Sequence, residues 1–326
     1  MLISIIAVNW NGEKILEKFI ENLISINYAD KEIIIVDNGS CDNSVEILKK
    51  YKQIKYYVLK KNLGFAGGNN FGIRQSSGDY LMLVNTDVIC PPDILIGFSE
   101  YYNKLPESVA EKKGAFMPVI LLADGKINSL GSYLYKDFHP YNIGFNEEHT
   151  KIDEFLKLRK PTGFYGACVF INKKMIEDIG FFNEEYFLYH EETDLAIRGL
   201  CKGWQYDIIR NIQIEHLHSY SSVELSFKKI FYSERNRLFN LIKYGLLSEI
   251  LTSPYYTLTR YFKTLFNKKL LHSKKTQTSV FSKFVIPAAI MSAYAALIFY
   301  IDSLFYFRYK NKIKNRDFLV TFKNVI

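Results

Sequence analysis

The stretch "DYLMLVNTD" at Asp79–Asp87 decides the fold. An uninterrupted apolar run, Tyr80–Val84, stops abruptly at Asn85-Thr86-Asp87. A continuous apolar run of this length is typical of a strand buried on both faces of a parallel sheet. Asn and Asp after a strand are also ordinary turn residues, because their side chains satisfy local backbone groups. The neighbouring segments decide between a simple turn and a ligand site.

The first 87 residues alternate between strand and helix patterns. Strand patterns occur at 2–9, 31–40, 54–61 and 79–87, and helical patterns at 12–26, 42–51 and 69–77. This order predicts an α/β fold with a doubly wound, mostly parallel sheet. Polar residues follow three of the strands, namely Asn9, Asn11, Asp37, Asn38, Asn85 and Asp87. Since ligands bind outside the carboxyl ends of such strands, the sequence favours a ligand site there.

The segment "NLGFAGGNNFG" at Asn62–Gly72 is rich in glycine and precedes a helical pattern. It matches neither the dinucleotide-binding pattern nor the P-loop pattern. A tight turn is one interpretation. Its polar content favours a second one, a close approach of the backbone to a ligand phosphate.

A second informative stretch runs from Gly166 to Trp204 and holds a strand, a helix, an aromatic loop and the helical segment "EETDLAIRGLCKG". Glu191, Glu192 and Asp194 lie in the first turn of that last helix. Acids there are favoured by the helix dipole, so a capping role is one interpretation. Crowded carboxylates also raise one another's pKa, which suits a general base.

Two histidines follow in "IEHLHSYSS", at His216 and His218. They are either structural histidines or, together with Asp87, ligands of a divalent metal.

The composition indicates a folded protein with a sizeable core. Of 326 residues, 48% are hydrophobic and 16% aromatic, which excludes bulk disorder. The four cysteines have no metal-type or pairing spacing and suit a reducing compartment. The N-terminal "MLISIIAVNWNG" is interpreted as a first strand rather than a signal peptide.

Charge divides the chain into two parts. Residues 227–326 hold 18 Lys+Arg and 4 Asp+Glu, whereas residues 1–226 hold 24 and 30. We therefore predict one domain over 1–226 and a basic, aromatic helical extension over 227–326. The extension includes 18 uncharged residues at 284–301, the lower limit for a membrane span. The alternatives are an in-plane membrane helix, a span, or a soluble or dimerising helical appendage.

The order of motifs resembles the inverting family 2 glycosyltransferases, specifically their rhamnosyltransferase-like branch, over about residues 1–240. The motifs are "VNWNG", "VDNGS", "NLGFAGGNN", "NTDV", "GACVFINKK", "FFNEEYFLYHEETDLAIRGLCKGW" and "HLHSYS". The resemblance implies a GT-A fold, with a nucleotide-sugar half over about 1–90 and an acceptor half over about 91–226. It implies metal-dependent transfer of a sugar, with rhamnose as one candidate, from a dTDP- or UDP-sugar to a glycan hydroxyl. The acceptor would be lipid-linked, in cell-surface polysaccharide synthesis.

The resemblance also implies roles for residues. Asp37 would bind the pyrimidine N3–H. Asn85-Thr86-Asp87 would be the family's D-x-D element, with Asn85 in place of the first acid and Asp87 bound to Mg²⁺ or Mn²⁺. His216 would be the second metal ligand, with His218 as the fallback. Glu192 matches the general base, usually Asp in this family, with Glu191 and Asp194 beside it. The implied nucleotide-sugar site comprises Val8, Asn9, Asp37, Asn38, Asn62, Gly67, Asn69, Asn85, Thr86 and Asp87.

Partners and location follow from the same argument. We expect a nucleotide-sugar donor, a glycan or lipid-linked acceptor and a membrane surface, with the protein peripheral or monotopic on the cytoplasmic face of the cell membrane. A homodimer through the C-terminal helices is the alternative use of the extension. Nucleic acid is disfavoured, because a nucleic-acid-binding arm has no need of a long uncharged run. A nucleotide-binding α/β protein without transferase activity is the alternative function, and the carboxylates at 191–194 favour transfer over it.

Overall fold

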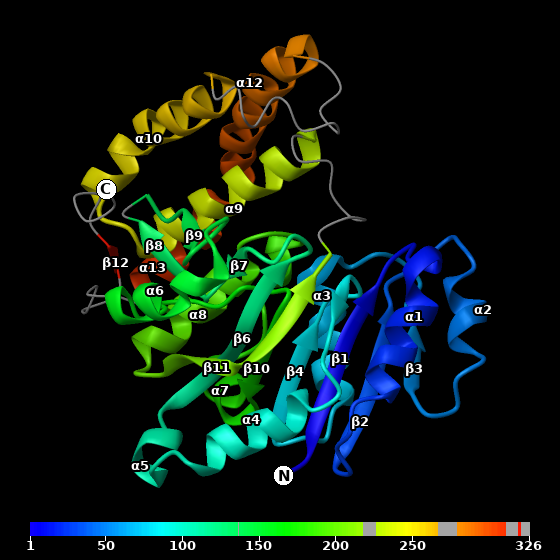
Figure 1. Ribbon diagram of the computed structural model, residues 1–326. Helices are drawn as coiled ribbons and strands as arrows, with labels where there is room; N and C mark the ends of the chain where they lie inside the picture. Colours follow the sequence, from blue (N-terminus) through cyan, green and yellow to red (C-terminus); the bar gives the residue numbers. More distant parts are fainter. Residues whose placement is uncertain (136, 218–225, 267–278, 311–318, 321–326) are drawn as a thin grey trace. The chain divides into compact units, whose positions relative to one another are not determined.

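The computed structural model describes residues 1–135, 137–217, 226–266, 279–310 and 319–320 (Figure 1). The chain groups into two compact units. The sheet unit comprises Met1–Tyr133, Tyr141–Phe187 and Glu191–Tyr220. The C-terminal unit comprises Leu134–Pro140, Leu188–His190 and Ser221–Ile326. The domain boundary at 226, placed from the charge distribution, stays a prediction.

The sheet unit is built on one nine-stranded sheet of order β3-β2-β1-β4-β10-β6-β11-β5, with β7 beside β6. The first four strands are mutually parallel, as the sequence predicts, while β10 runs antiparallel to both its neighbours. The predicted α/β architecture with a mostly parallel sheet is therefore confirmed. The strands are β1 (Ile3–Asn9), β2 (Lys31–Asp37), β3 (Lys55–Val58), β4 (Tyr80–Val84), β5 (Val88–Ile89), β6 (Lys113–Leu122), β7 (Ile127–Ser129), β10 (Cys168–Asn172) and β11 (Gln205–His216).

Helices cover both faces of this sheet, and its strands bury side chains on both. In β1, Ile3 and Ile5 belong to the core cluster on one face of the sheet, and Ile6 belongs to the cluster on the other face. The first cluster includes α1 (Glu13–Ile24), α2 (Ser44–Leu48) and α4 (Ile94–Asn103), and the second includes α3 (Gly64–Gln75), α7 (Lys173–Ile179) and α8 (Glu191–Cys201). The smaller elements are α5 (Glu107–Ala110), α6 (Ile152–Leu158), β8 (Ser132–Tyr135), β9 (Pro140–Asn142) and β12 (Leu319–Val320).

The glycine-rich segment is helical, which differs from the predicted start of that helix at 69. Helix α3 begins at Gly64 because its glycines allow it to lie close to β1. A Cβ added at Gly68 would lie 2.7 Å from Val8 Cγ1, and one at Gly72 would lie 2.5 Å from Ile6 Cγ2. Glycine costs a helix about 1 kcal/mol relative to alanine, and here the close packing offsets that cost. Gly67 also lies inside this helix.

The C-terminal unit is helical. It contains α9 (Phe227–Tyr244), α10 (Leu247–Phe266), α12 (Ser279–Ala296) and α13 (Ile301–Lys310). Helix α9 contacts each of the other three, and α12 packs along it (Figure 1). Among the described residues no single helix has the length and hydropathy to cross a membrane; 284–299 and 301–309 reach them only as a pair bent by 65°.

Two charged side chains of α9, Glu234 and Arg237, lie in the interior of the C-terminal unit. The guanidinium of Arg237 donates to Glu234 at 2.6 Å and to Ser253 and Thr257 at 2.9 Å each. Burial alone would raise the pKa of Glu234, but attraction to Arg237 and Arg260 outweighs it and lowers that pKa to about 2. A buried ion pair is tolerated when its partners satisfy it in this way.

Two histidines, the half-buried His139 and the buried His190, belong to the same network. Arg260 donates to Asp137 at 2.8 Å and contacts His139 Nδ1 at 3.1 Å, and His190 Nε2 contacts Ser233 Oγ at 3.0 Å. Burial, and then repulsion from the arginines, lowers the pKa of His190 to about 3 and that of His139 well below 6.5. Both imidazoles are therefore neutral in the folded protein at neutral pH.

Acid should destabilise the C-terminal unit. A histidine pKa lowered by folding contributes stability that is present above 6.5, its value in the unfolded chain, and is lost as the pH falls toward 3. We expect a lower melting temperature at pH about 5 than at neutral pH, and a smaller difference for His190→Gln, which does not titrate. An equal loss in His190→Gln would contradict the assignment to this histidine.

Candidate active site

The carboxyl ends of β1 and β2 hold a fixed carboxylate. Asn9 and Asp37 are register partners, and Asn9 Nδ2 donates to Asp37 Oδ2 at 3.0 Å. The backbone N–H of Ser40 donates to Asp37 Oδ1, also at 3.0 Å. Within the described residues, the buried Oδ1 of Asn9 has no hydrogen-bond partner. Ser40 was not among the predicted site residues, although it ends the quoted motif "VDNGS".

The predicted donor-site asparagines build the turn that leads into α3. Asn38 Nδ2 donates to Asn62 Oδ1 at 3.1 Å and to the carbonyl of Gly64 at 3.0 Å, and its Oδ1 accepts from the N–H of Leu63. Asn69 Nδ2 donates to the carbonyl one turn earlier, at 2.9 Å. The structure thus brings these residues together beside β1 and β2, where they fix the backbone.

The turn Asn85-Thr86-Asp87 leads directly into a second strand pairing. Strand β5 pairs antiparallel with β11, and this pairing places Val88 opposite His216. Asp87 Oδ1 consequently lies 3.2 Å from His216 Nε2, and both side chains are buried. Asn85 and Thr86 are half-buried. The predicted pairing of Asp87 with His216 is present, whereas His218 lies outside the described residues.

Asn128, which no sequence pattern singled out, orients His216. It lies on β7, is fully buried, and its Oδ1 is 3.0 Å from His216 Nδ1. Asn128 thus contacts one nitrogen of the ring, while the other, Nε2, faces the carboxylate of Asp87.

A divalent cation fits this pair chemically. Imidazole and carboxylate both bind Mn²⁺, and a histidine ligand commonly donates its other N–H to a polar partner such as Asn128. Among the described residues, no group of three or more His, Cys, Asp and Glu side chains converges as a complete metal site. Asp87 and His216 would therefore share the ion with phosphate oxygens of a bound substrate, as Mg²⁺ sites commonly do.

The three acids at the start of α8 have different surroundings. Asp194 is 1% exposed; it accepts from Arg198 Nε at 2.9 Å and from the hydroxyl of Tyr186 at 3.2 Å. Arg198 also donates to the carbonyls of Ile179, the last residue of α7, and of Gly180 and Phe181, which follow it. Asp194 is thus committed to a structural ion pair.

Glu191 and Glu192 differ in their burial. Burial, followed by repulsion from Glu192, raises the pKa of Glu191 well above 4.5, because both disfavour its charged form. Glu192 is half-buried and lies in the first turn of α8, where the helix dipole favours a negative charge. Glu192 is therefore the acid best placed to take a proton from a bound molecule.

The loop before α8 is strained. Phe187, Tyr189 and His190 all have a positive φ, which costs on the order of 1–3 kcal/mol for each non-glycine residue. The carbonyl of Phe187 accepts from the N–H of Phe65 at 2.7 Å. A Cβ at Gly64 would lie 2.1 Å from that carbonyl, so only glycine allows this approach. Strain of this kind concentrates at functional sites.

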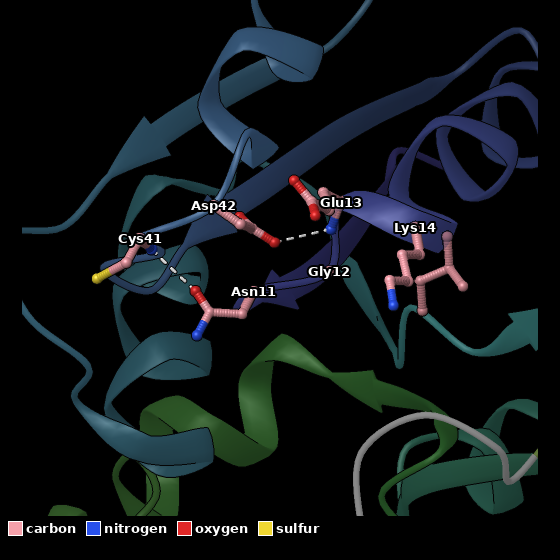
Figure 2. A pocket seen from close by; sticks show the side chains of 7 residues that line it. Asn11, Gly12, Glu13, Lys14, Cys41 and Asp42 are labelled. Atoms are coloured by element: carbon pink, nitrogen blue, oxygen red, sulfur yellow. Dashed lines mark hydrogen bonds between the residues drawn. The ribbon is translucent and has the colours of Figure 1, made fainter.

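A pocket of about 470 Å³ opens beside the start of α1, as Figure 2 shows. The N–H of Glu13 at this helix end already donates to Asp42 Oδ2, so the protein's own carboxylate occupies the place of an anion. Asn11, one of the polar residues at the predicted strand ends, lines this pocket, whereas none of the residues assigned to the nucleotide-sugar or metal site does. Its lining residues are Asn11, Gly12, Glu13, Lys14, Ile15, Cys41 and Asp42.

These features combine an α/β sheet, polar residues at the carboxyl ends of its strands and a group of carboxylates at a helix start. Residues 4–180 match the model of the glycosyl transferase family 2. The chain belongs to this family and is a glycosyltransferase, which confirms the predicted family and enzyme class.

Curated relatives include two polysaccharide-related enzymes. The chain is 21% identical over 248 residues to the N-acetylglucosaminyl-diphospho-decaprenol L-rhamnosyltransferase of Mycobacterium tuberculosis, covering 68% of this chain and 78% of the relative. It is 32% identical over 108 residues to the poly-beta-1,6-N-acetyl-D-glucosamine synthase of Staphylococcus epidermidis, covering 32% of this chain and 26% of that synthase.

Solved structures share the fold. TarS 1-349 of S. aureus in complex with UDP-GlcNAc matches with a TM-score of 0.55 and 15% identity, over 94% of this chain and 90% of that one. The mannosyltransferase PcManGT of Pyrobaculum calidifontis, in complex with GDP-Man and Mn²⁺, matches with a TM-score of 0.52 and 13% identity, over 92% and 75%.

Proposed function

We propose that this glycosyltransferase moves a sugar, with rhamnose as the first candidate, from a dTDP- or UDP-sugar to a hydroxyl of a lipid-linked glycan, with inversion at the anomeric carbon. The observation that carries the proposal is the division of roles among the acids of α8. Asp194 accepts from Arg198, Glu191 is buried, and Glu192 is the half-buried carboxylate at the start of α8.

The acceptor hydroxyl is a poor nucleophile, and Glu192 would take its proton as the oxygen attacks the anomeric carbon. The nucleoside diphosphate leaves from the opposite side, so one displacement gives inversion. Asp37, whose orientation is fixed by Asn9 and Ser40, would accept a hydrogen bond from the pyrimidine N3–H.

Asp87 and His216 would hold a Mg²⁺ or Mn²⁺ ion beside the donor's diphosphate. When bound, such an ion neutralises the charge that develops on the leaving group. Asn128 fixes the ring of His216 in the orientation that this role needs.

Two observations favour the donor and acceptor named here. The rhamnosyltransferase relative is named for a lipid-diphosphate acceptor and extends over 68% of this chain. The motif "HLHSYS" and the Asn at the first D-x-D position match the rhamnosyltransferase-like pattern.

A donor screen tests the proposal. Purified full-length protein is incubated with dTDP- and UDP-sugars, a divalent metal and a lipid-linked acceptor, and released nucleoside diphosphate is measured. We expect release that depends on the acceptor, with dTDP-rhamnose turned over best. Turnover of a UDP-sugar alone would keep the transferase and replace the donor; no release with any pair would contradict the proposed donor and acceptor classes together.

We expect Asn128 to affect activity through the affinity of the enzyme for its metal ion. We expect Asn128→Ala to raise the Mn²⁺ concentration for half-maximal activity about 10- to 100-fold, the usual effect of removing a partner of a metal ligand. Ser129→Ala is the matched control, because Ser129 is equally buried on β7 and donates to the carbonyl of Gly131 instead. An equal shift in both variants would make Asn128 a general structural residue.

A further inference from the structure

The C-terminal unit has its polar groups inside and apolar groups outside. On α10, Ser253 and Thr257 are 1% exposed and face the buried charges of Arg237 and Glu234. The opposite side of the helix carries an exposed apolar row, which we call the α10 stripe. Its members are Leu247, Leu251, Tyr255, Leu258 and Phe262, each between 63% and 72% exposed.

The stripe follows helical geometry closely. Its members are spaced by four, four, three and four residues, so they lie along one face of α10. None of the exposed side chains that the structure describes on this helix is charged. A row of this kind in water is unfavourable, and large exposed apolar patches mark interaction sites.

The neighbouring helices extend the pattern. Phe284 and Met291 on α12 are 76% and 72% exposed, and Tyr306 and Tyr309 on α13 are 68% and 79% exposed. The buried charges of this unit and its exposed aromatic and aliphatic side chains invert the usual distribution in a water-soluble domain. That distribution suits a surface that faces an apolar medium.

Charge decides between a lipid surface and a second copy of the chain. Five lysines lie between positions 263 and 275, directly after the stripe in sequence. A second copy would bring the same positive charge against them, and like charges across an interface oppose association. Anionic headgroups attract them at about 1 kcal/mol for each basic residue near the surface.

We propose that the α10 stripe docks in the plane of a bilayer that contains anionic phospholipid, with its side chains in the boundary between headgroups and acyl chains. The helix lies on the membrane rather than across it. Docking of this kind keeps a glycosyltransferase at the surface where lipid-linked acceptors are found. The proposal does not depend on the identity of the transferred sugar.

Vesicle binding tests the stripe without reference to catalysis. Full-length protein is sedimented with phosphatidylcholine vesicles that contain or lack phosphatidylglycerol. We expect binding to the anionic vesicles, of which high salt releases only a minor part, since apolar insertion is not screened. Leu251→Glu and Leu258→Glu should each lower the partition coefficient about tenfold or more, because a charge replaces an inserted apolar group.

A matched control separates the stripe from a general effect of charge. Leu158→Glu makes the same change at a leucine that is 67% exposed on α6 in the sheet unit. We expect it to bind vesicles like the unmodified protein. Tyr255→Trp adds a reporter without adding charge, and its fluorescence should shift to the blue on anionic vesicles and be quenched by brominated lipid.

Four results would overturn the proposal. The unmodified protein stays in the supernatant with anionic vesicles at low salt. Alternatively, Leu251→Glu and Leu258→Glu bind as strongly as Leu158→Glu, or the Tyr255→Trp emission does not change. A dimer that Leu251→Glu dissociates, without vesicle binding, would assign the stripe to a second copy of the chain. Donor turnover measured on the same samples keeps these outcomes distinct from a failure of the proposed reaction.

Discussion

Glu192→Gln should lower kcat by about 100-fold or more, the scale typical of a lost general base, while donor binding and melting temperature stay unchanged. The side chain is half-buried at the start of α8, and glutamine keeps its size but cannot take the acceptor's proton. Steady-state transfer, donor titration and thermal melting check the three quantities. Glu177→Gln, the same change at an exposed position of α7, is the control and should leave kcat unaffected.

Asp194 offers the sharpest contrast. Its carboxylate is buried against Arg198 and Tyr186, so Asp194→Asn should first lower stability, by roughly 3–5 kcal/mol for a broken buried pair. If Glu192→Gln instead kept near-full turnover while Asp194→Asn lost it at unchanged stability, the base would be Asp194.

Removal of divalent metal should stop transfer. In the proposed reaction Asp87 and His216, whose Oδ1 and Nε2 lie 3.2 Å apart, would hold an ion beside the diphosphate leaving group. In EDTA we expect activity to fall to background, and Mn²⁺ or Mg²⁺ to restore it in the unmodified protein. Asp87→Asn should lose activity at metal concentrations that saturate the unmodified enzyme, because an amide is a weaker ligand than a carboxylate.

The control for this experiment is Asp93→Asn, a change at an exposed acid just before α4. It should show the normal metal dependence. Full activity of the metal-stripped enzyme in EDTA would leave Asp87 and His216 as a structural pair and Asn85-Thr86-Asp87 as a turn that only connects two strands.

The sequence predicted the sheet because its strand signals are local. The apolar runs of β1, β2 and β4 end in Asn or Asp within a few residues, and periodicity alone places those ends. The sequence also predicted that Asn9 and Asp37 lie close together, because the carboxyl ends of neighbouring parallel strands lie at the same edge of a sheet. The meeting of Asp87 with His216 was predicted from the family resemblance and not from spacing.

Other features could not be predicted because they depend on contacts distant in sequence. Asn128 is an ordinary polar residue on a three-residue strand, and only folding brings it to His216. The helix start at Gly64 was missed because glycine lowers helix propensity, while its packing benefit appears only against β1. In α9, the burial of Arg237 could not be predicted from spacing, because its partners Ser253 and Thr257 lie on another helix.

The chain passes between the two units several times. The segments Leu134–Pro140 and Leu188–His190 belong to the C-terminal unit although the sheet unit surrounds them in sequence. Asn236 Nδ2 donates to the carbonyls of Leu188 and Tyr189, at 2.9 and 2.7 Å, just before the α8 acids. A gene shortened to end near residue 226 would remove Asn236, which donates to those carbonyls, and Arg260, which donates to Asp137. We therefore expect such a shortened chain to be less stable than the full one, because it loses hydrogen bonds to segments that precede the cut by many residues.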